Sequence, residues 1–576
     1  MGRLVMRGVW VGALGAAMTL TATSAHAQRK PKGATVAQQS PVDMDADQPV
    51  AKPAPRKSGG SHAAVAAGGG SDVAAQAKKL YETEKYWEAA QSFYRVSIGE
   101  TGDDEGNKQI AQFGLAKSLY KLRLYQAAYS IFSEIADNPN HLKYGETLLW
   151  VAKLATDLPE PADIIERVGK YSEEHVAKFN NDEQRELYWQ LNYLLGRYRY
   201  RNGKYPDALG LFDKVNRKSK YYVQAQFFAG ITNVQMRRSS PAVQSFERIL
   251  GAIEEGDVPS EDEARFRDLA YLSMARTFYS ASIKVDENTN QPTVDQTRLS
   301  AAVKYWNKVD VASEYWLDAL FEESWAYFMA GDYSHALGNI HTIQAPYFPH
   351  AYYPEADVLK AVIYFSNCQY DDALTIVARF RGQFQPIREE LTKTLNRFKK
   401  GSNQEEAFYK FLRDVRDDRA QLDPKVAPVV KTALSDRQLL RNLEYVRLLD
   451  EEESRFKKAP SAFKQAKVGD LVQDSIHDAR ALAVRNTGEL AMGRYQRNLD
   501  DLNEQLRNGQ KILIDITAAQ RNQLDQLMQN ALTTAEESKA NIVKPDEEHV
   551  IWPFNGEYWR DELGFYRQTI TSKCTR

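Results

Sequence analysis

The sequence has few cysteines, no excess of charge of either sign, and no long apolar run beyond its first residues. Cys368 and Cys574 are its only cysteines, so no cysteine near the amino terminus is available to carry a lipid. Lys and Arg number 75 and Asp and Glu number 77, which gives a formal charge of −2. A nucleic-acid-binding domain is normally strongly basic, and a transmembrane helix needs ~18 consecutive apolar residues. The composition therefore argues against a nucleic-acid partner and against a membrane span in the mature chain.

Motifs of common enzymes and metal sites are also absent. H-E-x-x-H, G-x-S-x-G and C-x-x-C do not occur. His335, His341 and His350 are close in sequence, but the spacing of six between the first two does not align them on one helix face. Carboxylate pairs such as Glu547 and Glu548 occur in any charged helical protein. We predict a non-enzymatic protein with no cofactor and no metal.

The first residues have the pattern of an export signal. Arg3 and Arg7 precede a short apolar run, and the small residues Ala25 and Ala27 form an A-x-A cleavage pattern. The apolar run is too short to span a bilayer easily. We therefore predict a signal peptide over 1–27 and a protein of the bacterial periplasm or a secreted protein, with association with the outer membrane through partners as a further expectation.

Composition changes divide the remaining chain into four parts. Residues 28–72 are rich in Pro, Ala, Gly and Ser and are predicted to form a disordered linker, because such a segment buries too little apolar surface to offset its ordering entropy. Helical periodicity begins after it. We place a repeat array at 73–380, a region of long helices at 381–540, and an aromatic-rich tail at 541–576.

A short phrase recurs along the second of these parts. In "RNGKYPDALGLF", Ala208, Leu209 and Phe212 follow Tyr205 at +3, +4 and +7, which is one face of a helix. The same intervals start at Tyr86, Tyr125, Ser239, Leu299, Tyr333 and Tyr370, and two of the spacings, 205 to 239 and 299 to 333, are 34 residues. The gap between 125 and 205 can hold one degenerate unit, around "PADIIERV".

Another helix, the first of each hairpin, precedes each phrase. Gly196 lies nine residues before Tyr205, and a small residue there permits close packing within a helical hairpin. Gly203 and Gly331 lie in the turns, where a left-handed backbone costs glycine little. An ordinary amphipathic bundle shares the 3.6 period, but the repeated 34-residue spacing favours a repeat. The sequence predicts an all-α fold, a superhelix of hairpins followed by long helices.

These units resemble the tetratricopeptide repeat family over roughly residues 73 to 380. Two positions depart from the family pattern, Asn192 near the start of a first helix and Lys220 at the place of the closing proline. The resemblance rests on two groups of residues: Gly196, Gly203, Tyr205, Ala208 and Phe212, and Gly331, Tyr333, Ala336 and Leu337.

The resemblance implies a groove, lined by the first helices, that holds partner segments. Cations beside aromatic rings suit an acidic, extended segment. The alternative is that these side chains pack between helices. The expected groove residues are Lys117, Tyr120, Lys121, Tyr193, Arg197, Tyr200 and Arg201. Later units would present the more apolar residues Phe321, Trp325, Phe328, Val358, Val362 and Phe365.

Residues 381–540 keep strong helical propensity after the phrase fades. Leu499, Leu502, Leu506, Leu513 and Ile516 recur at coiled-coil-like spacing. Gly509 and Gln520 interrupt the pattern. We expect long helices that pack on each other or on the superhelix, with a dimer seam as the alternative. The run "LDEEESRFKK" is expected to lie on a solvated helix face.

The tail crowds aromatic residues into "WPFNGEYWRDELGFY", of which "EYWRDELGFY" is expected to form one short helix. The rings either cap the final helices or dock a partner through Trp552, Phe554, Tyr558 and Trp559. With the domain order, this tail resembles exported envelope repeat proteins of myxobacteria and their relatives, a group that includes components of the adventurous gliding-motility machinery.

The two cysteines leave two alternatives. Cys368 lies in an expected repeat turn and Cys574 near the end of the chain. In an oxidising compartment they could form a disulfide that pins the tail to the last repeat. Otherwise one thiol is buried and the other is exposed.

These observations lead to one expected function and two alternatives. We expect a protein–protein interaction scaffold in the bacterial envelope, in a motility or envelope-assembly complex, with other envelope proteins as partners. The first alternative is an accessory factor or enzyme acting on peptidoglycan or another envelope polysaccharide. The second is a self-assembling structural protein.

Overall fold

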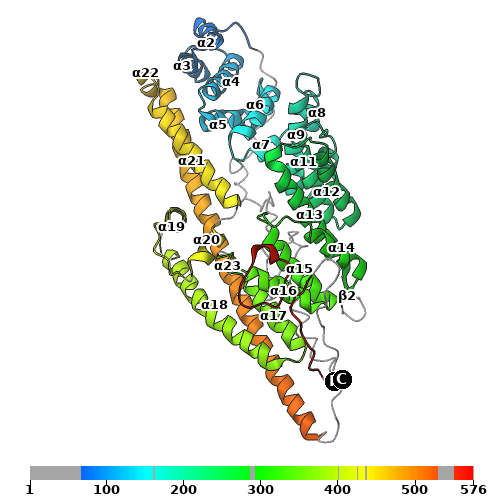
Figure 1. Ribbon diagram of the computed structural model, residues 1–576. Helices are drawn as coiled ribbons and strands as arrows, with labels where there is room; N and C mark the ends of the chain where they lie inside the picture. The colour runs from blue at the N-terminus through cyan, green and yellow to red at the C-terminus, as the bar shows by residue number, and fades with distance from the viewer. Residues whose placement is uncertain are drawn as a thin grey trace, which may run out of the picture.

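The computed structural model describes residues 67–159, 163–285, 292–349, 351–399, 401, 403–424, 426–434, 437–529 and 550–574. The expected signal peptide, most of the expected linker, and His350, Glu547 and Glu548 lie outside these residues. Within them the fold is all-α, as predicted, and consecutive helices pack as hairpins along an arc (Figure 1). None of the described helices is long and apolar enough to cross a bilayer.

Six hairpins contain the recurrent phrase in one structural position. In each, the Tyr or Ser at the start of the phrase is the first residue of the second helix. The pairs are α2 (Asp72–Glu82) with α3 (Tyr86–Ser97), α4 (Glu105–Lys121) with α5 (Tyr125–Ala136), α9 (Arg185–Arg201) with α10 (Tyr205–Phe212), α11 (Tyr222–Gln235) with α12 (Ser239–Glu254), α15 (Trp316–Ala330) with α16 (Tyr333–Ile343), and α17 (Pro354–Ser366) with α18 (Tyr370–Phe398).

Two further units depart from this form. The expected degenerate unit consists of α6 (Tyr144–Asp157), α7 (Ile164–Val168) and α8 (Glu173–Ala177). The unit containing Leu299 consists of α13 (Ser260–Ser282) and α14 (Gln296–Trp306). Between them lies an antiparallel pair that the sequence did not predict, β1 (Ile283–Val285) and β2 (Pro292–Val294), with Ile283 opposite Val294.

The six hairpin turns share one backbone conformation. The residue two positions before each second helix has a positive φ, which is 70° at Gly203 and 79° at Gly331. The next residue then donates its N–H to the carbonyl five positions earlier, as Lys204 does to Arg199 at 2.9 Å. This is the Schellman pattern that ends a helix. Non-glycine residues adopt the same conformation at Glu84, Arg123, Arg237 and Cys368.

Close packing inside the hairpins follows the small-to-large pattern of the phrase. Ala208 and Phe212 are fully buried. A Cβ at Gly196 would lie 2.6 Å from the ring of Phe212, and one at Gly230 would lie 2.4 Å from the ring of Phe246. The small residue nine positions before the phrase therefore makes room for its aromatic residue, as predicted.

The C-terminal helices bridge the two ends of the arc. They are α19 (Gln404–Arg416), α20 (Ala427–Ala433), α21 (Arg437–Lys457), α22 (Ser461–Lys464) and the 63-residue α23 (Lys467–Gln529). The long helix contacts α3 and α5 of the first hairpins and α17 and α18 of the last (Figure 1). Leu499, Leu502 and Ile516 are buried within the chain. The expectation of a long helix packed on the superhelix is therefore confirmed.

Candidate functional site

Two regions contain the residues predicted to bind partners: the first helices α4 and α9, and the tail. Lys117, Tyr120 and Lys121 lie on α4. Tyr193, Arg197, Tyr200 and Arg201 lie on α9. The four tail residues lie in 550–574, which passes over the last two hairpins.

On α4 the three expected residues differ in exposure. The Lys117 ammonium lies 4.7 Å from the centre of the Tyr81 ring, and burial lowers its pKa. The Tyr120 hydroxyl donates to Asp157 at 2.6 Å, and burial raises its pKa. Lys121 is exposed at the end of the helix. Lys121 is therefore the most accessible residue of this group, and its role in partner binding stays a prediction.

On α9, Tyr193, Arg197 and Tyr200 pack against the start and the body of α11, whereas Arg201 lies 4.0 Å from Glu166 of α7. The Arg197 guanidinium lies 5.0 Å from the centre of the Phe228 ring, and the Tyr193 ring stacks on Tyr221 at 5.5 Å. Arg197 is only 6% exposed. Tyr200 lies between the Tyr205 and Phe228 rings. These contacts show interhelical packing, and their role in partner binding stays a prediction.

Helix α21 borders the same region. A cavity of about 390 Å³ lies between α6, α7 and α9 on one side and α21 on the other. Arg197 lines it together with Arg441 and Glu444 of α21. The sequence did not indicate that a helix more than 200 residues away would lie beside Arg197.

In the later units, Val358 and Val362 are buried in the core.

Backbone N–H groups of the tail form hydrogen bonds with α16. Gly564 donates its N–H to the Thr342 hydroxyl at 3.1 Å, and Gln568 donates to the Ser334 carbonyl at 3.1 Å. Leu563 and Ile570 are buried against the hairpins. The tail is therefore an integral part of the last two hairpins.

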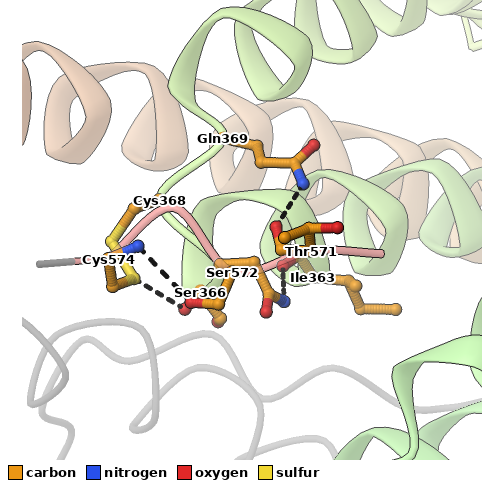
Figure 2. Close-up of a disulfide and its surroundings, with 8 residues drawn as sticks. Ile363, Ser366, Cys368, Gln369, Thr571, Ser572 and Cys574 are labelled. Carbon is orange, nitrogen blue, oxygen red and sulfur yellow. Dashed lines mark hydrogen bonds between the residues drawn. A yellow bond between two sulfur atoms is a disulfide. The ribbon is translucent and has the colours of Figure 1, made fainter. Parts of the chain in front are cut away.

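A disulfide fixes the end of the tail. Cys368, in the turn between α17 and α18, is bonded to Cys574, with a Cα–Cα distance of 5.0 Å (Figure 2). Beside it Gln369 donates its side-chain N–H to the Thr571 carbonyl at 2.6 Å (Figure 2). Lys573 donates its backbone N–H to the Asn367 carbonyl at 2.9 Å. Of the two alternatives for the cysteines, the structure has the disulfide.

The short helix expected for "EYWRDELGFY" does not form. The structure has only a 3-10 turn, η1 (Arg560–Glu562). Gly564 follows with a φ of 90°, which an α-helix does not contain. The N–H groups of Gly564 and Gln568 bond to α16 and not to their own segment. Hydrogen bonds between the tail and α16 have replaced the hydrogen bonds that a helix within the tail would have formed.

An aromatic cluster forms where the tail crosses α16. The His341 ring has Phe554, Tyr558 and Tyr566 around it, with ring centres at 4.6, 4.9 and 4.9 Å. Burial, and then the charge of Lys360, lower the pKa of His341. A neutral imidazole suits this apolar cage. Phe554 and Tyr558 thus support the interpretation that the tail caps the final helices.

The two tryptophans among the expected docking residues remain open to solvent. Trp552 is 78% exposed and Trp559 is 56% exposed. Val550, Ile551, Phe554 and Phe565 of the tail are also exposed. We call these six residues the docked-tail surface. Monomeric proteins seldom present so much apolar side chain in one short segment without a binding role.

Partly buried carboxyl groups on the later hairpins were not predicted from the sequence. Asp318 accepts a hydrogen bond from the Tyr353 hydroxyl at 2.6 Å, and burial raises its pKa to about 6. Burial raises the pKa of Glu355 to about 7. Among the described residues no cluster of His, Cys, Asp and Glu could hold a metal ion. The sequence feature that could have indicated these two acids is their place in the first turn of a helix, α15 for Asp318 and α17 for Glu355.

Two comparisons, with protein-family models and with curated proteins, give no match for this chain. The class that the geometry defines is an all-α protein of stacked helical hairpins bridged by a long C-terminal helix.

Proposed function

We propose that this chain is an exported tetratricopeptide-repeat protein that acts as a non-enzymatic scaffold and binds other proteins of the bacterial envelope. The docked-tail surface carries the proposal. Tryptophan is enriched at the energetic centres of protein interfaces. Exposed Trp552 and Trp559 are held on a segment that a disulfide and backbone hydrogen bonds fasten to the last hairpins.

Three observations support the repeat family and the location. The six Schellman turns and the glycine–aromatic pairs repeat at the positions that carry the resemblance. The disulfide suits an oxidising compartment such as the periplasm. The signal-peptide pattern of residues 1–27 agrees with export. A motility or envelope-assembly complex is part of the proposal because of the resemblance of the tail sequence and domain order, which no comparison tests, to exported envelope repeat proteins of myxobacteria.

Capture from crosslinked native envelopes tests the docked-tail surface. A tagged chain is compared with Trp552→Ala/Trp559→Ala, and the captured proteins are identified by mass spectrometry. The matched control is Leu482→Ala/Ile514→Ala, which removes two apolar side chains that are 52% and 60% exposed on α23. We expect a reproducible set of envelope proteins that the tryptophan variant loses and the control retains, followed by direct binding of a purified member.

A second arm tests the expected groove on α4. Lys121→Glu reverses an exposed charge there, and Lys79→Glu on α2 is the matched control. If Lys121→Glu loses the captured proteins and Lys79→Glu retains them, the result supports binding of acidic segments at this groove. Arg197 is unsuitable for charge reversal because it is buried against Phe228. If only the bait returns from every sample, the scaffold is rejected, and cosedimentation with cell-wall polymer and the mass in solution become the measurements to make.

A further inference from the structure

A basic pocket lies between the last repeat helix and the long C-terminal helix. Its volume is about 350 Å³. Arg381 and Arg388 of α18 and Arg507 of α23 line it, and the rest of the lining is one leucine and amide side chains. The amides belong to Gln385, Asn503 and Gln510. The lining contains three guanidinium groups and no carboxylate.

The helical spacing of these residues explains why they meet. Arg381, Gln385 and Arg388 follow one another by four and three residues, and so do Asn503, Arg507 and Gln510. Residues at this spacing share one face of a helix. Because α18 and α23 pack along each other, the two polar stripes face a common space. The pocket thus joins residues of two helices, and its lining residues on α18 lie more than 100 positions before those on α23.

The cations of this pocket are poorly neutralised within the protein. Arg388 has a carboxylate partner in Glu389 at 3.6 Å, and its Nε is buried without a hydrogen-bond partner in the described chain. Within the described residues neither Arg381 nor Arg507 forms an ion pair with a carboxylate. Like charges at one site repel one another, and unused N–H donors favour an acceptor from outside.

We propose that this pocket binds a phosphate-bearing ligand. A guanidinium fork matches the oxygens of a phosphate with two parallel hydrogen bonds. Three cations balance the two or more negative charges of a phosphate or pyrophosphate group better than the single charge of a carboxylate. The amide side chains supply neutral donors at the same wall. The volume falls within the roughly 300–1,000 Å³ of small-molecule sites.

Binding here ties α23 to the last hairpin. An anion between Arg381 and Arg507 replaces the repulsion between the two helices by a shared hydrogen-bonded partner. The ligand therefore also stabilises the folded chain, by an amount that grows with the logarithm of its concentration relative to the dissociation constant. This property is independent of the protein partners proposed above.

Calorimetric titration of the full chain with inorganic phosphate and with pyrophosphate tests the proposal. The matched variants are Arg381→Gln/Arg507→Gln and Arg485→Gln/Arg521→Gln, which remove equal charge from the pocket and from exposed positions of α23. We expect pyrophosphate affinity to fall at least tenfold in the pocket variant and to change less than twofold in the control. Absence of binding to the unsubstituted chain, or equal losses in both variants, overturns the proposal.

A second probe distinguishes a phosphate on a lipid headgroup from a phosphate on a free compound. Vesicles of phosphatidylglycerol and phosphatidylcholine are sedimented with the same variants. Recruitment to phosphatidylglycerol that requires Arg381 and Arg507 assigns a lipid headgroup. Binding of pyrophosphate without recruitment assigns a free phosphorylated compound. Equal recruitment of the pocket and control variants, without pyrophosphate binding, is surface attraction and rejects the site.

Discussion

The carboxylate of Glu452 accepts hydrogen bonds from the backbone N–H groups of Gln126 at 2.8 Å and Ala127 at 3.1 Å. Gln126 and Ala127 are in the first turn of α5, whose preceding residue, Leu124, supplies no side-chain cap. Glu452 comes from α21, and only 3% of it is exposed. A residue of the C-terminal bridge thus completes the start of a repeat helix, where a negative group is favourable.

Removal of this cap tests how strongly the bridge holds the first hairpins. Glu452→Ala leaves the N–H groups of Gln126 and Ala127 without their acceptor, at a cost of about 1–3 kcal/mol for each buried group. We expect a clear fall in the urea midpoint. Glu451→Ala, on the exposed face of the same helix, is the control and is expected to change stability by less than about 0.5 kcal/mol. Equal midpoints for the two variants would show that the cap is unimportant.

Gly338 sets how closely the tail approaches α16. A Cβ at this position would lie 1.6 Å from the carbonyl oxygen of Tyr566. We expect Gly338→Ala to displace the tail and to expose the bond after Arg567 to trypsin. In the control, Gly210→Ala on α10, the new methyl meets nothing within 4 Å. That change should leave cleavage unaltered and stabilise the helix by up to about 1 kcal/mol. Unchanged cleavage in both variants would mean that the tail adjusts without leaving.

The disulfide closes a loop of large sequence separation, 206 residues. In the loop-entropy description such a crosslink contributes about 5 kcal/mol. We expect Cys368→Ser/Cys574→Ser to lower the thermal midpoint and to speed deuterium uptake over residues 550–574. Reductant should reproduce both effects in the unsubstituted chain and add nothing to the double variant. A further effect of reductant on the double variant would trace the change to something other than this bond.

Glu355 and Asp501 make stability depend on pH. Burial, and then neighbouring carboxylates, raise the pKa of each group to about 7, from ordinary values of 4.5 and 3.8. Since the folded pKa is the higher one, their contribution is complete below the unfolded pKa and is lost as the pH rises through about 7.

Substitution of Glu355 measures this dependence. We expect the thermal midpoint of the unsubstituted chain to fall between pH 5 and pH 8, and Glu355→Gln to reduce the fall by about 2 kcal/mol in free energy. Glu489→Gln removes an exposed carboxylate of α23 and serves as the control, with no change in slope expected. Parallel curves for all three proteins would contradict a partly buried carboxyl group with a raised pKa at position 355.

Much of the repeat array could be predicted from local sequence. Tyr205, Ala208 and Phe212 specify a helix face, and Gly196 specifies how near the preceding helix comes, because both features are encoded within one hairpin. Gly203 and Gly331 indicated the left-handed turn. The same turn at Glu84, Arg123, Arg237 and Cys368 was not evident, since its closing hydrogen bonds outweigh the roughly 1 kcal/mol cost of that conformation for other residues.

The candidate sites could be predicted from the sequence less well than the repeat array. Arg197 and Tyr193 have the composition of a binding surface, yet their burial depends on Phe228 and Tyr221 of the next hairpin. Glu452 lies in the charge run "LDEEESRFKK", which was predicted to lie on a solvated helix face. Its burial follows from the position of α21 against α5.

The sequence alone determined the all-α class, the hairpin period and the first residue of six second helices, because these follow from contacts between residues fewer than about 40 positions apart. Only the tertiary structure decided the path of the tail, the Cys368–Cys574 bond, the cap from Glu452 and the arginine pocket. Each of these joins segments more than 100 residues apart. Their meeting depends on the summed curvature of the hairpins and on one long helix that spans them, which no local pattern specifies.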